Sequence, residues 1–282
     1  MTGYADDPDG IFQTVRGLRE TYHFLAFVEM TLTNLLAGKR ALVTGAAHGN
    51  GAAIALGMAK HGANVVLLDI DADALEARAT EIRQQGLCCS SAILDVSDSE
   101  QCLRLAKETG FDQAGLDILV NNAGIRPRHA FESGDRDFHW ERAMKVNLDG
   151  IRNTTLAWME GLKRSKGTVI NITSIAAFNA SPGSIAYSTS KAAAQMLTKA
   201  LAYELAADGI RVNSIAPGVI ETEMTRSSRE DSVRRERLIA RIPMARFGKP
   251  DDLVGAVIFL ASDLSTYVTG CTIAVDGGYL AN

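Results

Sequence analysis

The feature that most constrains the fold is a regular alternation between short apolar runs and longer segments with helical periodicity. The apolar runs are rich in β-branched residues and are bounded by Gly, Asp or Asn, as expected for parallel strands covered on both faces. They occupy residues 41–43, 65–68, 92–94, 118–120, 169–172, 212–215 and 272–275. Helical segments such as 52–61, 72–85 and 186–207 lie between most of them. The sequence therefore predicts an α/β fold in a single domain, with a doubly wound, parallel, seven-stranded sheet and helices on both faces.

Composition narrows the class of partner. The chain has 282 residues, of which 46% are hydrophobic, so it can bury a sizeable core. A net charge of -4 leaves no excess of Lys and Arg to neutralise nucleic acid or an anionic membrane. No apolar run approaches the ~18 residues of a membrane span, and the N-terminus has no basic signal region. The four cysteines match no zinc spacing, so no metal site is expected. We therefore expect a small-molecule substrate, no nucleic-acid or membrane partner, and a cytoplasmic protein.

Two segments fall outside the alternating pattern. Residues 1–38 contain apolar side chains but no strand-like run, and we expect an N-terminal extension there, either a helical arm or a packing or subunit-contact arm. Met30 offers an alternative start. Residues 39–282 form the predicted NAD-binding domain. Within it, residues 221–244 are rich in Arg and follow a predicted strand end, where a substrate lid would sit. A solvated helix is the alternative explanation of their charges.

A glycine-rich turn follows the first predicted strand and opens a helix. Its residues are Gly45, His48, Gly49, Asn50 and Gly51. Such a turn lets backbone N–H groups at a helix N-terminus approach a pyrophosphate, and the helix dipole favours the negative charge. A tight turn without a ligand is the alternative. The turn predicts the phosphate-binding part of a dinucleotide site.

Asp69 ends the second predicted strand, close to the ~20-residue offset from the turn at which an acidic residue meets the adenosine ribose. Its carboxylate can accept hydrogen bonds from both ribose hydroxyls. The same charge would repel a 2′-phosphate, and no Arg or Lys stands at residues 70–73 to compensate. The sequence therefore predicts NAD in preference to NADP. A cap for the following helix is the alternative role of Asp69.

Several separated motifs, in a fixed order, resemble those of the short-chain dehydrogenase/reductase family. They are the Thr44-Gly45-x-x-x-Gly49-x-Gly51 turn, Asn121-Asn122-Ala123-Gly124, Ser174, Tyr187-x-x-x-Lys191, Pro217-Gly218 and Asp276-Gly277-Gly278. The resemblance covers about residues 39–278 and is nearest to 3-oxoacyl carrier-protein reductases and to sugar or polyol dehydrogenases. It implies a Rossmann-type fold and an oxidoreductase that transfers a hydride between a nicotinamide cofactor and a carbonyl carbon.

Tyr187 and Lys191 form the expected proton-transfer centre. Hydride transfer to a carbonyl builds negative charge on its oxygen, so an acid must deliver a proton, and Tyr187 is placed for that. Lys191 lies one helical turn away, where its charge would favour the phenolate. Ser174 would hold the substrate oxygen. The resemblance implies that Lys191 also binds the nicotinamide ribose and that Asn147 completes a water-linked proton path. The alternatives are a packed aromatic with a solvated amine for Tyr187 and Lys191, a turn residue for Ser174, and a helix-bending amide for Asn147.

Further cofactor contacts follow from the resemblance alone. Asp95 and Val96 are expected near the adenine, and Asn122, Ala123 and Gly124 along the adenosine. Residues expected to hold the nicotinamide carboxamide are Pro217, Gly218, Ile220 and Thr222, and Ile70 completes the predicted cofactor-binding set. His48 and Asn50 depart from the residues that the family often has in the turn, so local contacts to the pyrophosphate or the substrate entrance can differ.

The substrate class rests on residues after the fourth strand. Arg126, Arg128 and His129 are close enough to its end to meet an anionic substrate such as a sugar acid, a phosphate or a carrier-protein arm, with solvation of the rim as the alternative. The leading hypothesis is an NAD-linked polyol, sugar or sugar-acid dehydrogenase. A 3-oxoacyl thioester reductase is the nearest competitor, and a dinucleotide-binding sensor without turnover is the hypothesis from another class. The resemblance also implies a homotetramer.

Overall fold

The computed structural model describes residues 34–180 and 182–281, which form one seven-stranded sheet. Its strands, all parallel, are β1 (Arg40–Thr44), β2 (Asn64–Asp69), β3 (Cys89–Ile93), β4 (Ile118–Asn121), β5 (Thr168–Ile172), β6 (Arg211–Pro217) and β7 (Thr272–Val275). Their order is β3-β2-β1-β4-β5-β6-β7, so the winding reverses between β1 and β4. The predicted doubly wound sheet is confirmed. Ligands of such sheets bind beyond the carboxyl ends of the strands at this reversal.

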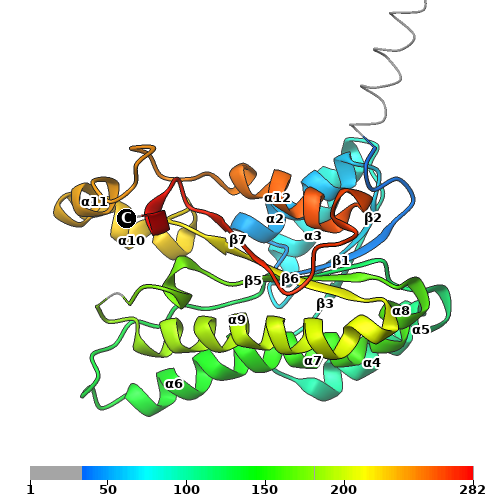
Figure 1. Cartoon of the computed structure of the whole chain (residues 1–282), viewed down its shortest axis with the longest axis horizontal. Coiled ribbons are helices and arrows are strands. Elements are labelled where there is room, and N and C mark those ends of the chain that lie inside the picture. Colours follow the sequence, from blue (N-terminus) through cyan, green and yellow to red (C-terminus); the bar gives the residue numbers. More distant parts are fainter. Residues whose placement is uncertain (1–33, 181, 282) are drawn as a thin grey trace, which may run out of the picture.

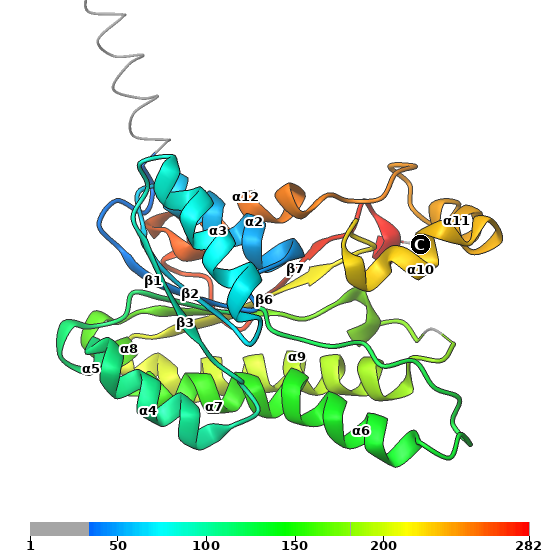
Figure 2. The same ribbon diagram turned by 180° about the vertical axis from the view of Figure 1, so that it is seen from behind.

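Helices cover both faces of the sheet (Figures 1 and 2). One face carries α2 (Gly49–Lys60), α3 (Ala72–Gln84) and α12 (Val254–Ala261). The other face carries α4 (Ser99–Thr109), α5 (Phe111–Ala114), α6 (Arg136–Met144), α7 (Gly150–Ala157), α8 (Met159–Ser165) and α9 (Ile185–Leu205). The short helices α10 (Arg226–Glu230) and α11 (Ser232–Ile239) lie beyond the carboxyl end of β6.

The hydrophobic core is divided by the sheet into two clusters. Val43 and Leu67 belong to the cluster beneath α2 and α12, whereas Leu42 and Leu68 belong to the cluster beneath α4 and α7. Successive side chains of a strand point to opposite faces, and here both faces are covered by helices. This geometry explains why the central strands read as unbroken apolar runs instead of alternating ones.

The edge strand β3 differs from its prediction. It spans Cys89–Ile93, whereas the apolar run that predicted it covers residues 92–94. Its side chains are half-buried or exposed, and Ser90 and Ser91 pair with Val66 and Leu67 of β2. Backbone hydrogen bonds to one neighbour fix this strand, so it needs no apolar run of its own.

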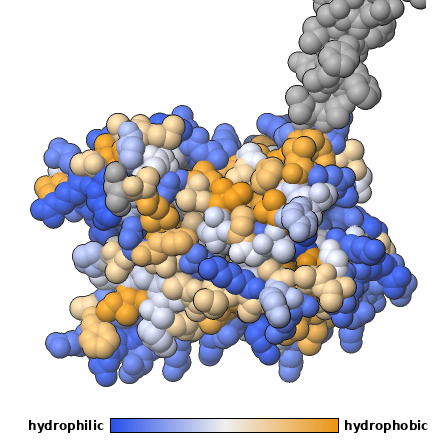
Figure 3. Space-filling model, in the orientation of Figure 1, coloured by the Kyte–Doolittle hydropathy of each residue, from blue (hydrophilic) through white to orange (hydrophobic). Residues whose placement is uncertain are grey.

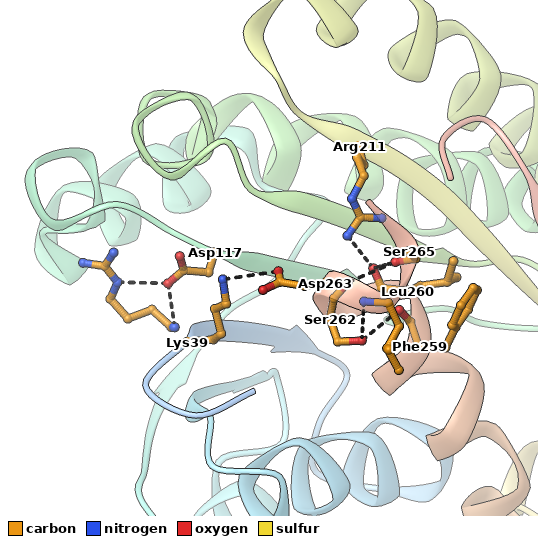
Figure 4. A network of polar contacts seen from close by, with 10 residues as sticks. Lys39, Asp117, Arg211, Phe259, Leu260, Ser262, Asp263 and Ser265 are labelled. Atoms are coloured by element: carbon orange, nitrogen blue, oxygen red, sulfur yellow. Dashed lines mark hydrogen bonds and ion pairs between the residues drawn. The ribbon is translucent and has the colours of Figure 1, made fainter. Parts of the chain in front are cut away.

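Polar contacts fix the amino-terminal edge of the sheet, opposite the edge where ligands bind (Figure 4). Arg211, at the start of β6, donates from Nη2 to the carbonyl oxygen of Leu260 in α12 at 2.8 Å. Lys39, just before β1, lies 3.9 Å from the carboxylate of Asp263. The latter pair is exposed and contributes little, so the partly buried Arg211 bond is the more important link between α12 and the sheet. These contacts lie at the amino ends of the strands, and none of them occupies the carboxyl edge of the sheet, where ligands bind.

The chain before β1 is partly described. Leu36 is fully buried, and its N–H donates to the carbonyl oxygen of His61 at 2.9 Å, so residues 34–38 pack against the end of α2. The remainder of the predicted arm, residues 1–33 with Met30, lies outside the described residues. In the part of the chain that the structure describes, no helix is both long enough and apolar enough to span a membrane.

Candidate functional site

One cavity of about 990 Å³ opens at the carboxyl ends of the strands. Its wall is built by the turn after β1, by the residues that follow β2, β3, β4, β5 and β6, and by α10 and α11. All predicted site residues line this cavity except Gly51 and Asn147. These six strand ends therefore bring together residues that are spread over more than half of the sequence.

The glycine-rich turn forms a tight cradle at one end of the cavity. Gly45 and Gly49 have φ of 63° and 50°, in the left-handed region that favours glycine. A Cβ on Gly51 would lie 2.0 Å from the carbonyl oxygen of Gly45, so no side chain fits there. The turn leads into α2, and His48 at its N-cap makes no side-chain capping bond. Uncapped N–H groups and the absence of side chains fit the pyrophosphate of a dinucleotide.

Asp69 stands beside this cradle, with its carboxylate held by the backbone. Oδ2 accepts a hydrogen bond from the N–H of Ala47 at 3.0 Å, and Oδ1 accepts one from Asp71 at 3.1 Å. Asp71, not Asp69, caps α3, because its side chain accepts from Ala74. The alternative reading of Asp69 as a helix cap is therefore excluded. Ile70, with 67% of its surface exposed, lies open to the cavity.

His48 reaches across the cradle to the loop after β2. Its Nε2 lies 3.0 Å from Oδ2 of Asp71, and this hydrogen bond is the main reason that the pKa of the Asp71 carboxyl is lowered. The imidazole thus stands on the side of the site where the adenosine ribose is expected. The identities of residues 70–73 alone do not indicate this contact.

Asn122 joins the ends of β1 and β4. Its Nδ2 donates to the carbonyl oxygens of Thr44 and Gly45, both at 3.0 Å, so the amide side chain holds the turn in place. Gly124 lies deeper in the cavity, where a Cβ would come within 3.1 Å of Asn147 and 3.2 Å of Lys191 Nζ. The Asn122-Ala123-Gly124 segment therefore connects the cradle to the predicted proton-transfer centre.

Tyr187 and Lys191 lie one turn apart on α9, both buried in the cavity wall. Lys191 Nζ donates to the carbonyl oxygen of Ile172 at 2.8 Å, and burial lowers the pKa of Lys191 to about 8. Burial raises the pKa of Tyr187, whereas a side-chain hydrogen bond from Ser174 opposes that rise. Ser174 follows β5, and its Oγ also accepts the N–H of Ala176 at 3.0 Å, so it serves as a turn cap as well.

Arg126 supplies a further positive charge beside Tyr187, in addition to the one predicted for Lys191. Its guanidinium carbon lies 5.4 Å from the centroid of the Tyr187 ring, and its charge lowers the pKa of Tyr187 against the effect of burial. Nη2 of Arg126 also donates to Ser184 Oγ at 3.2 Å, just before α9 begins. The position of Arg126 soon after β4 marked it as a substrate contact, but proximity to Tyr187 arises only when α9 packs under this loop.

Asn147 lies behind the cavity, fully buried, in a π-helical segment spanning Lys145–Asp149. Its Oδ1 accepts from the N–H of Ile125 at 2.8 Å, and its Nδ2 donates to the carbonyl oxygen of Ile125 and to Ser190 Oγ, both at 2.9 Å. The side chain is therefore engaged with the loop after β4. Its predicted place in a proton path stays a prediction.

The segment after β6 completes the cofactor side of the cavity. Gly218 packs against Asp276, because a Cβ there would lie 2.7 Å from the Asp276 Cα. Ile220 is buried, and Thr222 faces the cradle, with its Cγ2 3.1 Å from the position of a Cβ on Gly49. Pro217 and Thr222 both line the cavity, and their predicted contact with the nicotinamide carboxamide stays a prediction.

Residues 221–244, the predicted lid, contain α10 and α11 (Figure 1). Arg229 anchors α10 to the loop before it, since Nη2 donates to the carbonyl oxygen of Thr222 at 3.1 Å. Arg234 of α11 and Arg126 line the cavity, whereas Arg128 does not. His129 does not line it. That imidazole stacks on His139 of α6, with ring centroids 5.4 Å apart.

No group of three or more His, Cys, Asp or Glu residues within residues 34–180 and 182–281 could hold a metal ion. All four cysteines are free, and burial raises the pKa values of Cys89, Cys102 and Cys271.

Comparison with known proteins agrees with this geometry. A family model described as enoyl-(acyl carrier protein) reductase matches residues 45–280. The chain is 39% identical to 3-oxoacyl-[acyl-carrier-protein] reductase FabG of Thermotoga maritima, over 86% of this chain and 98% of that protein. It is 41% identical to 2-dehydro-3-deoxy-D-gluconate 5-dehydrogenase of Bacillus subtilis, over 87% of this chain and 96% of that protein.

Solved structures give the same family. The crystal structure of a gluconate 5-dehydrogenase from Burkholderia cenocepacia, in complex with NADP and tartrate, is 37% identical and has a TM-score of 0.85. The match covers 89% of this chain and 99% of that chain. Three further solved relatives, 38% to 40% identical, also contain NADP.

These relatives overturn the prediction of NAD in preference to NADP, which is wrong. That prediction treated the Asp69 carboxylate as free to bind ribose and to repel a phosphate. In the structure both of its oxygens accept backbone N–H groups, which partly offset its charge. The prediction also considered only residues 70–73, whereas His48 extends from the turn after β1 and its Nε2 lies 3.0 Å from Oδ2 of Asp71.

The matched motifs, the seven-stranded sheet and the cavity at its carboxyl edge lead to one assignment. The relatives are similar over nearly the full described length, so the likeness is not restricted to the dinucleotide-binding half of the fold. This chain belongs to the short-chain dehydrogenase/reductase family of oxidoreductases.

Proposed function

We propose that the protein is an NADP(H)-dependent oxidoreductase that interconverts a secondary alcohol and a ketone on a sugar acid. The observation that carries the proposal is the buried Tyr187 hydroxyl, which is hydrogen-bonded to Ser174 and lies under the Arg126 guanidinium. This hydroxyl faces a cavity that also contains the glycine cradle. Relatives named for gluconate and 2-dehydro-3-deoxy-D-gluconate support the substrate class, and NADP in solved relatives supports the cofactor.

The proposed reduction begins with the substrate carbonyl oxygen beside Tyr187 and Ser174. The bound nicotinamide supplies the hydride, and negative charge develops on the carbonyl oxygen as it arrives. Tyr187 Oη donates its proton to that oxygen, while Ser174 Oγ donates a hydrogen bond that holds it in place. In oxidation, the Tyr187 phenolate accepts the proton of the substrate hydroxyl. Proton transfer of this kind contributes about 10²- to 10⁴-fold to the rate.

Lys191 and Asn147 are proposed to position these groups. Lys191 is anchored by Ile172 and lies against the backbone of Gly124, where a nicotinamide ribose hydroxyl would be within its reach. Asn147 holds the loop at Ile125, one residue before Arg126, and so fixes the position from which that guanidinium reaches Tyr187. Both residues hold the reacting groups in position, and neither accepts the substrate proton.

A panel of compounds that differ in charge or in chemical class tests the proposed substrate class. With NADP⁺, D-gluconate, its uncharged analogue D-glucitol and a 3-hydroxybutyryl thioester are compared at equal concentrations. A charge-assisted hydrogen bond contributes roughly 1.5–3 kcal/mol, so kcat/KM for the acid should exceed that for glucitol by about 10- to 100-fold. Turnover of the thioester alone would contradict the proposal and favour the function of the 39% identical FabG relative. NADPH binding without turnover of any compound would favour a sensor.

Removal of Arg126 should change the pH dependence of oxidation. Oxidation needs the Tyr187 phenolate, so its rate rises with pH through the Tyr187 pKa, which Arg126 lowers and burial raises. In Arg126→Gln this rise should move to higher pH, and each unit of movement lowers the rate about tenfold at a fixed pH below the midpoint. Kcat at saturating substrate separates this effect from binding. Arg126→Lys should keep the charge and largely restore the profile, and an unchanged profile in Arg126→Gln would contradict the assignment.

We also propose that the protein forms a homotetramer. Large apolar side chains are exposed on the outer surface of α7 and α9, where Leu156, Met196 and Tyr203 are 52%, 63% and 89% exposed. A second apolar area gathers over α12 and β7 (Figure 3), and Leu264 and Tyr267, which lie between these two elements in the sequence, are also exposed. Two separate apolar surfaces are what a tetramer with two kinds of interface needs.

Light scattering tests the proposed assembly. At micromolar concentration we expect a mass about four times the 30.2 kDa of one chain. Introducing charge on α9 with Met196→Glu and Tyr203→Glu should reduce the mass to that of a smaller species, because it places unpaired charges in an apolar interface. Gln84→Glu, at an exposed position on α3 outside both apolar surfaces, provides a control for added negative charge. A monomer in the wild-type protein would contradict the proposal.

A further inference from the structure

A single hydroxyl joins two parts of the site that lie far apart in the sequence. Ser190 stands on α9 beside Lys191 and one turn after Tyr187, is fully buried, and does not line the cavity. Its Oγ donates a hydrogen bond to the carbonyl oxygen of Tyr187 at 2.8 Å. The same oxygen accepts a hydrogen bond from Nδ2 of Asn147 at 2.9 Å. Ser190 therefore connects the turn of α9 that carries Tyr187 with the π-helical segment behind the cavity.

Asn147 extends this connection to the loop after β4. Its amide makes two hydrogen bonds to the backbone of Ile125, accepting at 2.8 Å and donating at 2.9 Å. The next residue is Arg126, whose guanidinium carbon lies 5.4 Å from the centroid of the Tyr187 ring. The contacts thus form a closed circuit that starts at the backbone of Tyr187 and returns, through Arg126, to its ring.

An ordinary packing role is the alternative, because serine and threonine hydroxyls in helices often bond to a carbonyl one turn earlier. A second link on α9 represents this alternative. Thr198 is also buried, and its Oγ1 donates to the carbonyl oxygen of Ala194 at 2.8 Å and accepts from Nδ2 of Asn171 at 2.9 Å. None of these bonds reaches Tyr187 or the backbone of Ile125. The two links therefore share their chemistry and differ in what they hold.

The position of Arg126 matters because few groups act on the Tyr187 hydroxyl. Burial raises the pKa of Tyr187, whereas the hydrogen bond of Ser174 and the charge of Arg126 lower it. Lys191 is the cation on the same helix, one turn along. In the part of the chain that the structure describes, no charged group of the helices and strands packed against α9 adds to these effects. Coulomb energy falls with distance, so an outward shift of the loop after β4 would weaken the effect of Arg126 on the phenolate.

We propose that Ser190 is a positioning residue of the reaction, whose hydroxyl holds Asn147, and with it the loop of Arg126, in place over the Tyr187 ring. Without that hydroxyl the amide of Asn147 loses one acceptor, and a tie between the loop after β4 and α9 is removed. The inference rests on the proposed function in one respect, because it assumes that Tyr187 is the group that ionises during turnover.

Ser190→Ala tests the proposal, with Thr198→Val as its matched control. Both variants lose a buried hydroxyl that binds an asparagine amide, so both should have a lower melting temperature. In Ser190→Ala the midpoint of the rise of kcat with pH in oxidation should move up by about 0.5 to 1 pH unit, as expected for loss of one hydrogen bond, with unchanged NADPH affinity. Thr198→Val should keep the wild-type profile. Full-length protein with NADP⁺ and saturating D-gluconate, over a pH series, gives these values.

A double variant identifies the route of the effect. If Ser190 acts through Arg126, its loss has no further consequence once the guanidinium is gone, so Ser190→Ala combined with Arg126→Gln should have the pH profile of Arg126→Gln alone. Ser190→Cys keeps a weak donor and acceptor, and its profile should lie between those of the wild type and Ser190→Ala. A double variant that shows the sum of the two single shifts would contradict the proposed route.

A measurement without substrate separates this inference from the proposed function. The phenolate of tyrosine absorbs in the ultraviolet, and the difference between each protein and its Tyr187→Phe counterpart gives the titration of Tyr187 alone. A titration that moves to higher pH in Ser190→Ala but not in Thr198→Val, in a protein that oxidises no sugar acid, would support the inference and contradict the proposed substrate. An unchanged titration in Ser190→Ala, or an equal shift in Thr198→Val, would overturn the inference and leave the proposed function intact.

Discussion

Tyr187→Phe should lose about 10²- to 10⁴-fold in kcat in both directions, with little change in the binding of NADPH. The substitution removes one buried hydroxyl, which is hydrogen-bonded to Ser174, and keeps the ring that packs beneath Arg126. Hydride transfer then leaves an alkoxide with no acid to protonate it, because Lys191 is directed to the carbonyl oxygen of Ile172. Steady-state rates with NADPH and a keto acid, at several pH values, measure the effect.

The same change elsewhere on α9 provides the control. Tyr203 is 89% exposed and does not line the cavity, so Tyr203→Phe should keep the wild-type rate. NADPH titration by fluorescence shows whether the cofactor site of Tyr187→Phe is intact. Wild-type turnover in Tyr187→Phe at any pH would mean that another group, or water, delivers the proton.

The fold could be predicted because a strand that is buried on both faces of the sheet has an unbroken apolar run in its sequence. Leu42 and Val43 are adjacent in sequence and enter different clusters, which only a strand covered on both faces allows. The same reasoning misplaced the start of β3, because its first residues are Cys89, Ser90 and Ser91, which do not form an apolar run. Apolar runs thus locate a strand only as far as its own residues are apolar.

The residues of the site could be predicted from the sequence, but the contacts between them could not. Motif order identified Tyr187, Lys191 and Ser174, and packing brings all three into one cavity wall. It did not show that Arg126 lies over the Tyr187 ring, because that contact depends on how a loop after β4 meets the start of α9, some sixty residues later. Contacts between side chains this far apart in the sequence arise from tertiary packing, so the residues around either one do not predict them.

Asn147 and Asp69 illustrate the same limit for polar side chains. Each was assigned to a ligand or to water, and each uses its oxygen atoms on the backbone of a neighbouring loop. A buried polar group has to find partners, and the nearest loop N–H groups supply them before any ligand arrives. The error in cofactor preference had this origin, since the charge of Asp69 was considered without the hydrogen bonds that partly offset it.

Gly51→Ala should abolish measurable NADPH binding and lower kcat/KM by about 10³-fold or more. The added methyl group would lie 2.0 Å from the carbonyl oxygen of Gly45 and 2.5 Å from Nδ2 of Asn122. Neither atom can retreat, because Asn122 holds the turn through Thr44 and Gly45. The cradle has to open, and the N–H groups that would meet the pyrophosphate are displaced by more than a hydrogen bond tolerates. NADPH fluorescence titration and steady-state kinetics measure the loss.

Gly255→Ala is the matched control for this prediction. Gly255 also lies in the first turn of a helix, α12, but a Cβ there meets no atom within 4 Å. Alanine favours a helix over glycine, so this variant should be as stable as the wild type or more stable, by up to about 1 kcal/mol, with unchanged NADPH affinity. If Gly51→Ala instead bound NADPH as tightly as Gly255→Ala does, the glycine-rich turn would not be the phosphate cradle. The dinucleotide would then have to be bound by another part of the cavity wall, where Arg126, Arg229 and Arg234 supply positive charge.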